Sequence, residues 1–258
     1  MWPIKTNNFH MKTIVLVLGI SWLITAAGFT QNLTRNYFIS KDLELVKINE
    51  NAYIHVSYTE SKEWGRFPSN GMIFINKGKA FLLDTPTSDS LTMKLLIYLR
   101  DSLKLTIVGF ITNDWHSDSM GGLAVIHNAG IPSYASEMTR EIATLKGLPV
   151  PQNGFKNSTT LLLGDKEIVC SYYGPAHTLD NIVVWIPSEK ILFADCMIKE
   201  MKSQTLGNTA DGDVSSYAST VNKVKTNYPN AALVIPGHGD FGGLELIDHT
   251  LKLAKLVK

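Results

Sequence analysis

The chain has 258 residues, of which 45% are hydrophobic and 18% are charged, as is usual for a globular protein. Its 24 basic and 23 acidic residues give a net charge of +1. This balance gives no support to a polyanion-binding surface and therefore argues against a nucleic-acid partner.

The first feature in chain order is a secretory signal. The stretch "MKTIVLVLGISWLITAAGFTQ" begins at Met11 with Lys12 behind it, continues as an apolar run and ends in small residues. That is the pattern of a signal peptide, and the run is short for a membrane anchor, which is the alternative. We interpret residues 1–28 as an upstream extension plus signal peptide, and residues 29–258 as a single domain. The expected location is the periplasm, with no stable membrane span after cleavage.

Alternation and helical periodicity predict the remaining elements. Strands are expected at residues 43–48, 53–58, 72–76 and 81–84, then a helix at 88–100, a strand at 106–112 and helices at 121–128 and 136–146. The second half has expected strands at 160–163, 168–173, 182–186, 191–193 and 232–235, and helices at 214–227 and 243–257. With no linker dividing it, this order favours a layered α/β protein with two packed sheets and helices outside.

Polar side chains follow several predicted strands. They are Asp114, His116 and Asp118 in "ITNDWHSDSMGGL", and further along the chain His177, Cys196 and His238. Functional groups on loops at strand ends, held by a rigid scaffold, are a common enzyme layout. Imidazole, carboxylate and thiolate are the ligands of zinc, and the thiolate argues against magnesium or calcium. The sequence therefore predicts a zinc site.

The chain resembles a subclass B1 metallo-β-lactamase, in the branch known from Bacteroides, over nearly all of the predicted mature sequence. The matching stretches, in the family's order, are "EWGRFPSNGMI", "LLDTP", "TNDWHSDSMGGL", "KGLPVPQNGF", "GPAHTLDNIVVWIP", "ADCMIKE", "LGNTADGDV" and "IPGHGDFGG". The resemblance implies an αββα sandwich, with two mixed β-sheets, helices on the outer faces and a zinc site at the edge between the sheets.

Two zinc ions are implied by the resemblance. The family holds one zinc with three histidines, two of which correspond to His116 and His177. Its second zinc has an aspartate, a cysteine and a histidine, which match Asp118, Cys196 and His238.

The family's first histidine is replaced here by Asp114. Either the carboxylate of Asp114 binds zinc, or it is too short to reach the metal and that zinc is weak or absent. An additional carboxylate also makes the site less positive, which reduces the acidification of a metal-bound water. We therefore expect a weaker enzyme than relatives with three histidines, particularly at limiting zinc.

The resemblance implies hydrolysis of the β-lactam amide of penicillins, cephalosporins and carbapenems, which confers antibiotic resistance. A metal-bound hydroxide oriented by Asp118 is expected to attack, with Asn208 near the lactam carbonyl and Lys199 on the substrate carboxylate. A mobile flap falls on residues 58–68, with Trp64 at its tip. The alternatives are a surface lysine at 199, a turn residue at 208 and a packed loop aromatic at 64.

Two other functions stay open. One is a different hydrolase on the same scaffold, acting on a thioester or a lactone, because fold does not fix chemistry. Asp195, beside Cys196, would bring a carboxylate to the metal if the register slipped by one residue. The other is a zinc-binding protein with little or no turnover. A monomer is expected in each case.

Overall fold

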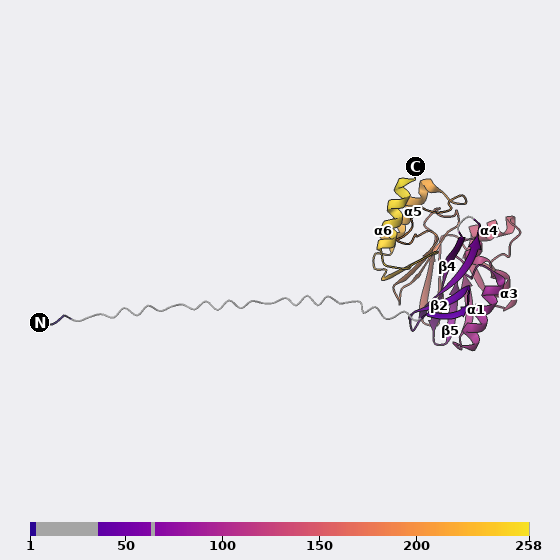
Figure 1. The fold of residues 1–258 in the computed structure, drawn as a ribbon, viewed down its shortest axis with the longest axis horizontal. Helices are drawn as coiled ribbons and strands as arrows, with labels where there is room; N and C mark the ends of the chain where they lie inside the picture. The colour runs from indigo at the N-terminus through magenta and orange to yellow at the C-terminus, as the bar shows by residue number, and fades with distance from the viewer. Residues whose placement is uncertain (4–35, 63–64, 258) are drawn as a thin grey trace. The chain divides into compact units, whose positions relative to one another are not determined.

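The structure is a computed structural model that describes residues 1–3, 36–62 and 65–257. The predicted signal segment at residues 11–28 and Trp64 lie outside the described residues. The helices and strands belong to the unit Thr34–Lys258 (Figure 1). None of the helices within the described residues has the length and apolar character of a membrane span.

The first sheet has eight strands that follow one another in chain order. They are β1 (Asn36–Ser40), β2 (Leu43–Asn49), β3 (Ala52–Ser61), β4 (Gly65–Asn76), β5 (Lys79–Leu83), β6 (Thr106–Ile111), β7 (Ser133–Ser136) and β8 (Asn153–Phe155). Strands β1 to β5 form an antiparallel meander. Strands β5 to β8 are parallel. The sheet is therefore mixed.

The second sheet has five strands in the order β13-β12-β11-β10-β9. Their bounds are β9 (Ser158–Leu163), β10 (Lys166–Ser171), β11 (Val183–Ile186), β12 (Ile191–Asp195) and β13 (Leu233–Pro236). Only β12 and β13 are parallel neighbours among these strands. This sheet is also mixed, as the resemblance implied.

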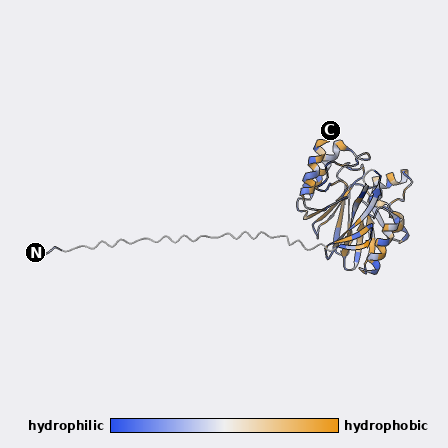
Figure 2. Cartoon of the chain, in the orientation of Figure 1, coloured by the Kyte–Doolittle hydropathy of each residue, from blue (hydrophilic) through white to orange (hydrophobic). Residues whose placement is uncertain are grey.

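Helices lie on the outer sides of the two sheets (Figure 1). They are α1 (Asp89–Asp101), α2 (Ser117–Met120), α3 (Leu123–Asn128), α4 (Glu137–Leu145), α5 (Val214–Asn227) and α6 (Glu245–Leu256). Residues of α1 and α3 share a core with the first sheet, and residues of α5 and α6 share one with the second. Polar and apolar residues alternate along these helices (Figure 2), because each helix has one buried side.

A third core lies between the sheets. Ile54, Phe74 and Phe193 are fully buried in it and come from both sheets. Burial of such large apolar side chains is what holds the two sheets together. The expected αββα sandwich is confirmed.

Most predicted elements are present, and the differences have local causes. Strands β1, β7 and β8 were not predicted. The predicted helix at 121–128 is present as α3, which begins two residues later, and the short α2 before it was not predicted. A Cβ at Gly122 would lie 2.0 Å from the Thr92 Oγ1. Gly122, between α2 and α3, therefore allows the backbone to pass close to α1.

Candidate metal centre

The loop after β6 is held by backbone contacts that fix where its side chains lie. The Thr112 hydroxyl donates to the Asp114 carbonyl at 2.7 Å, and the backbone N–H of Asn113 donates to Asp84 Oδ1 at 2.8 Å. Asp114 Oδ1 accepts from the backbone N–H of His116 at 2.9 Å, just before α2 begins. These hydrogen bonds fix the conformation of the turn that holds Asp114 and His116.

A first donor group joins this turn to the loop between β10 and β11. One ligand atom from each of Asp114, His116 and His177 lies within 4.8 Å of the other two. Asp114 Oδ2 is 3.8 Å from His116 Nδ1, and the rings of His116 and His177 meet edge to face with centroids 5.2 Å apart. Asp114 Oδ2 and His177 Nδ1 are buried and have no hydrogen-bond partner.

A second donor group consists of Asp118, Cys196 and His238. Cys196 Sγ is 3.2 Å from His238 Nε2 and 3.7 Å from Asp118 Oδ2, and His238 Nε2 is 3.3 Å from Asp118 Oδ2. The other ring nitrogen, Nδ1 of His238, lies 2.7 Å from the carbonyl oxygen of Pro68. A hydrogen bond to that carbonyl leaves Nε2 free to bind a metal.

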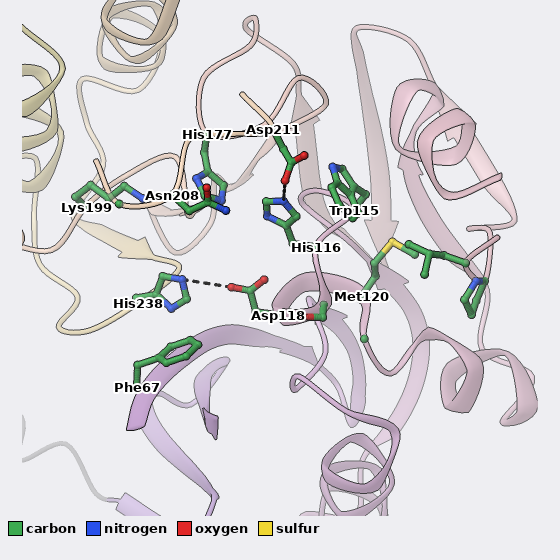
Figure 3. Close-up of a pocket in the computed structure, with 15 residues that line it drawn as sticks. Phe67, Trp115, His116, Asp118, Met120, His177, Lys199, Asn208, Asp211 and His238 are labelled. Carbon is green, nitrogen blue, oxygen red and sulfur yellow. Dashed lines mark hydrogen bonds and ion pairs between the residues drawn. The ribbon is translucent and has the colours of Figure 1, made fainter. Parts of the chain in front are cut away.

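Asp211 is a site residue that the sequence reasoning missed. Its Oδ2 lies 3.1 Å from His116 Nε2 (Figure 3), whereas Asp114 lies near the other ring nitrogen, Nδ1. A carboxylate there accepts the Nε2 proton and turns the Nδ1 lone pair toward the donor group. The only signal was its place in "LGNTADGDV", where the sequence indicated a turn and drew attention to Asn208 alone.

Burial and neighbouring charges set the protonation of one donor in each group. Burial alone would raise the pKa of the Asp118 carboxyl, but the hydrogen bond and charge of His238 outweigh it and hold that pKa below its usual range. Burial, reinforced by the charge of Lys199, lowers the pKa of His177 well below its usual value. Asp118 is therefore ionised and His177 neutral, which are the protonation states of metal ligands.

Two other donors hold their protons more tightly than usual. Burial, followed by the nearby charge of Asp195, raises the pKa of the Cys196 thiol and of the Asp114 carboxyl well above their usual values. Burial and Asp118 raise the pKa of Asp195 to about 6. An excess of buried acidic groups is what a divalent cation neutralises, so these groups release protons when metal binds.

Both donor groups border one cavity of about 730 Å³. Lys199 and Asn208 line it near His177, and Phe67 from β4 lies below His238 (Figure 3). Its opposite wall is apolar and is formed by Trp115, Met120, Leu148 and Pro149. The cavity therefore offers charge at one end and an apolar surface at the other.

The polar lining residues differ in exposure and bonding. Lys199 is only 8% exposed, and burial lowers the pKa of its ammonium group. Asn208 is exposed, and its Oδ1 accepts from the backbone N–H of Ala210 at 3.1 Å. The amide NH₂ of Asn208 is thus the end that can donate to a bound molecule.

The register at the end of β12 bears on the alternative raised by Asp195. The Ser119 hydroxyl donates to Asp195 Oδ2 at 3.4 Å, while the thiol of Cys196 faces His238. Asp195 has a φ of 46°, so the chain turns sharply just before Cys196. The cysteine, and not Asp195, joins the second donor group, so the slipped register does not occur.

The donor chemistry fits zinc. The second group combines thiolate, imidazole and carboxylate, and the first includes a buried oxygen of Asp114 with no hydrogen-bond partner. A sandwich of two mixed sheets with such a centre at the sheet edge defines a class of metal-dependent hydrolases.

The chain is similar to several known proteins of that class, although no protein-family model matches it. It is 44% identical over 243 residues to a metallo-beta-lactamase type 2 of Bacteroides fragilis, covering 94% of this chain and 96% of that protein. It is 32% identical to the Bacillus cereus metallo-beta-lactamase type 2, over 97% of this chain and 100% of that protein.

Among solved structures, the chain matches the mono-zinc form of the metallo-β-lactamase FIM-1 from Pseudomonas aeruginosa. The TM-score is 0.79 at 32% identity, with coverage of 85% of this chain and 98% of that one. The chain therefore belongs to the metallo-β-lactamase family, subclass B1, the zinc-dependent β-lactam hydrolases.

Proposed function

We propose that this protein hydrolyses the amide bond of penicillins, cephalosporins and carbapenems at a centre of two zinc ions, and thereby confers antibiotic resistance. The observation that carries the proposal is the convergence of two complete donor groups on one cavity. Zinc bound there would polarise the lactam carbonyl and make water nucleophilic at neutral pH.

The proposed zinc ligands fall into the two groups. Asp114, His116 and His177 would hold one ion. Asp118, Cys196 and His238 would hold the other.

The chain's own side chains supply the remaining steps. Asp118 is ionised and faces the cavity, so it would orient the attacking water and accept its proton. Water adds its oxygen to the carbonyl carbon, the C–N bond breaks, and the nitrogen leaves with a proton. The Asn208 amide would donate to the carbonyl oxygen as negative charge develops on it.

Lys199 supports recognition of the substrate carboxylate. Its ammonium group lies among buried acidic side chains and lines the cavity. A carboxylate that enters the cavity would exchange water for a charge-assisted hydrogen bond with this group. In the proposal Lys199 and Asn208 bind substrate, and Trp64, which the resemblance assigns to the flap, covers it.

An absorbance assay with nitrocefin and a carbapenem tests the proposal. Hydrolysis should require zinc, stop with a chelator and return when zinc is restored. Cys196→Ser should lose most of the turnover, while Asp240→Asn, a change of an exposed carboxylate, should keep it. Turnover of a thioester or lactone alone would favour another hydrolase, and zinc uptake without any turnover would favour a binding protein.

The proposal includes export and a monomeric state. The segment at residues 11–28 supports export to the periplasm as a single domain of residues 29–258. Fractionation of expressing cells should recover the protein in the periplasm with a new N-terminus near residue 29. Light scattering of that fraction should give the mass of one chain.

A further inference from the structure

The two donor groups differ in chemistry. The first, Asp114, His116 and His177, offers one carboxylate and two imidazoles, and the second includes the thiolate of Cys196. Two ions that share one cavity would thus have different kinds of ligand. Ligand type is one of the main determinants of which metal a protein site selects.

Asp114 is held so that one of its oxygens faces the first group. Oδ1 accepts from the backbone N–H of His116 at 2.9 Å, which prevents the carboxylate from turning away. Oδ2 is buried without any partner and lies 3.8 Å from His116 Nδ1. A carboxylate oxygen buried without a partner is costly unless a cation completes it.

The histidines support the same conclusion. Asp211 accepts from His116 Nε2, so Nδ1 is the nitrogen that faces Asp114. His177 Nδ1 is also buried without a partner. The cavity borders both rings, and Asp114 is buried behind them. One ligand atom of each residue lies within 4.8 Å of the other two, and the two histidines leave the group accessible from the cavity.

Two histidines and one carboxylate on one face, with open positions opposite, form the donor set of non-haem ferrous iron sites. A carboxylate is a harder ligand than an imidazole, and a thiolate is softer than both. The thiolate therefore favours zinc over ferrous iron at the second group. At the first group, a carboxylate in place of an imidazole reduces the difference in binding affinity between zinc and ferrous iron.

We propose that the Asp114–His116–His177 group accepts ferrous iron in competition with zinc, while the Asp118–Cys196–His238 group remains selective for zinc. The protein then holds a mixed iron–zinc centre when both ions are present. This inference rests on the proposed function for the existence of two metal positions in one site. It adds that the positions differ in the ion they select, as a consequence of Asp114.

The test is metal competition under anaerobic conditions. The metal-free protein receives one equivalent of zinc and one of ferrous iron, unbound metal is removed, and both are counted by mass spectrometry. The expected result is close to one zinc and one iron per chain. The nitric oxide adduct of the iron should give a paramagnetic resonance signal, which reports on the iron site independently of turnover.

Variants assign the ions to the groups. Asp114→His should let a second equivalent of zinc displace iron at lower concentration, with loss of the nitric oxide signal. Cys196→Ser should keep the iron and lose the zinc. Asp240→Asn, which removes an exposed carboxylate, should match the unchanged protein. Circular dichroism verifies that each variant is folded.

The inference is overturned if the unchanged protein retains no iron beside zinc, or if Asp114→His and the unchanged protein need the same zinc concentration to displace it. Zinc-dependent β-lactam hydrolysis would survive that result. A failure of the proposed function would instead appear as absent hydrolysis in the zinc-loaded protein, so the two failures are distinguishable.

Discussion

The imidazole of His116 and the carboxylate of Asp211 lie 3.1 Å apart, although 95 positions separate them in the chain. Because Asp211 accepts the Nε2 proton, it fixes the tautomer and the orientation of the ring. We predict that Asp211→Ala weakens metal binding at the first group by about 10- to 100-fold, with kcat falling at limiting zinc. Asp211→Asn, which retains an acceptor oxygen, should lose less. Equal zinc titrations of all three proteins would contradict this.

Zinc affinity should rise with pH. Burial, together with Asp195 and Asp118, raises the pKa of the Cys196 thiol well above its usual value. Zinc must expel this proton, so apparent affinity should gain about tenfold per pH unit while the thiol is protonated. Calorimetry in buffers of different ionisation enthalpy counts the released proton. A Cys196→Ser variant that releases just as many protons would show that the thiol is not their source.

Asp114→His should strengthen zinc binding at the first group and raise turnover. The change replaces a carboxylate by an imidazole and leaves the centre one unit more positive, which favours activation of water. Zinc content after dialysis and kcat with nitrocefin measure the effect at low and high zinc. The prediction fails if neither quantity increases at low zinc.

The apolar wall of the cavity should select for apolar substituents. We predict that Leu148→Asp lowers kcat/KM for a penicillin with an aryl acyl side chain by about tenfold. Hydrolysis of 6-aminopenicillanic acid, which lacks that side chain, should change little. Leu145→Asp is the matched control, since Leu145 is the last residue of α4, is 87% exposed and does not line the cavity. A similar loss for both substrates would indicate a general disturbance.

Mild acid should destabilise the fold through His55. This histidine is 1% exposed, its Nε2 lies 3.1 Å from the Asp84 carbonyl, and burial lowers its pKa to about 4. Its pKa in the unfolded chain is higher, so the unfolded state binds more protons between about pH 6.5 and 4. Stability is therefore full above that window and is lost as pH falls through it.

The loss should approach about 3 kcal/mol at the acid end. Urea unfolding at pH 7 and pH 5 measures it, and His55→Gln separates this contribution from that of the buried carboxyls. If the variant keeps the same difference between the two pH values, His55 is not responsible.

The convergence of the metal donors could be anticipated from the sequence. Asp118, Cys196 and His238 each follow an apolar strand, and buried strands of a layered fold end at a common edge. The predicted helix at 136–146 corresponds to α4, and the hydroxyl of Ser136 caps that helix by accepting from the backbone N–H of Thr139 at 3.0 Å. The sequence predicts these helices and strands because buried apolar residues recur with the period of a helix or a strand.

Contacts between distant loops could not be anticipated in the same way. The sequence around Asp211 indicates only a turn. The packing of its loop against the loop that holds His177 is what brings Asp211 to His116. The backbone N–H of Leu179 donates to the Asp211 carbonyl at 3.0 Å, and that of Asp213 donates to the Ala176 carbonyl at 3.0 Å. Such pairings depend on tertiary structure and leave no periodic pattern.

Each donor group takes residues from both halves of the sandwich. Asp114, in the loop after β6, and Asp118, in α2, come from the side of the first sheet, while His177, Cys196 and His238 come from loops of the second sheet. A bound ion thus cross-links the two halves of the sandwich, which apolar packing alone would otherwise hold together. Removal of the metal should first loosen the contact between the sheets near the donor groups. Resistance to heat and to proteases therefore depends on the available metal concentration as well as on the amino-acid sequence.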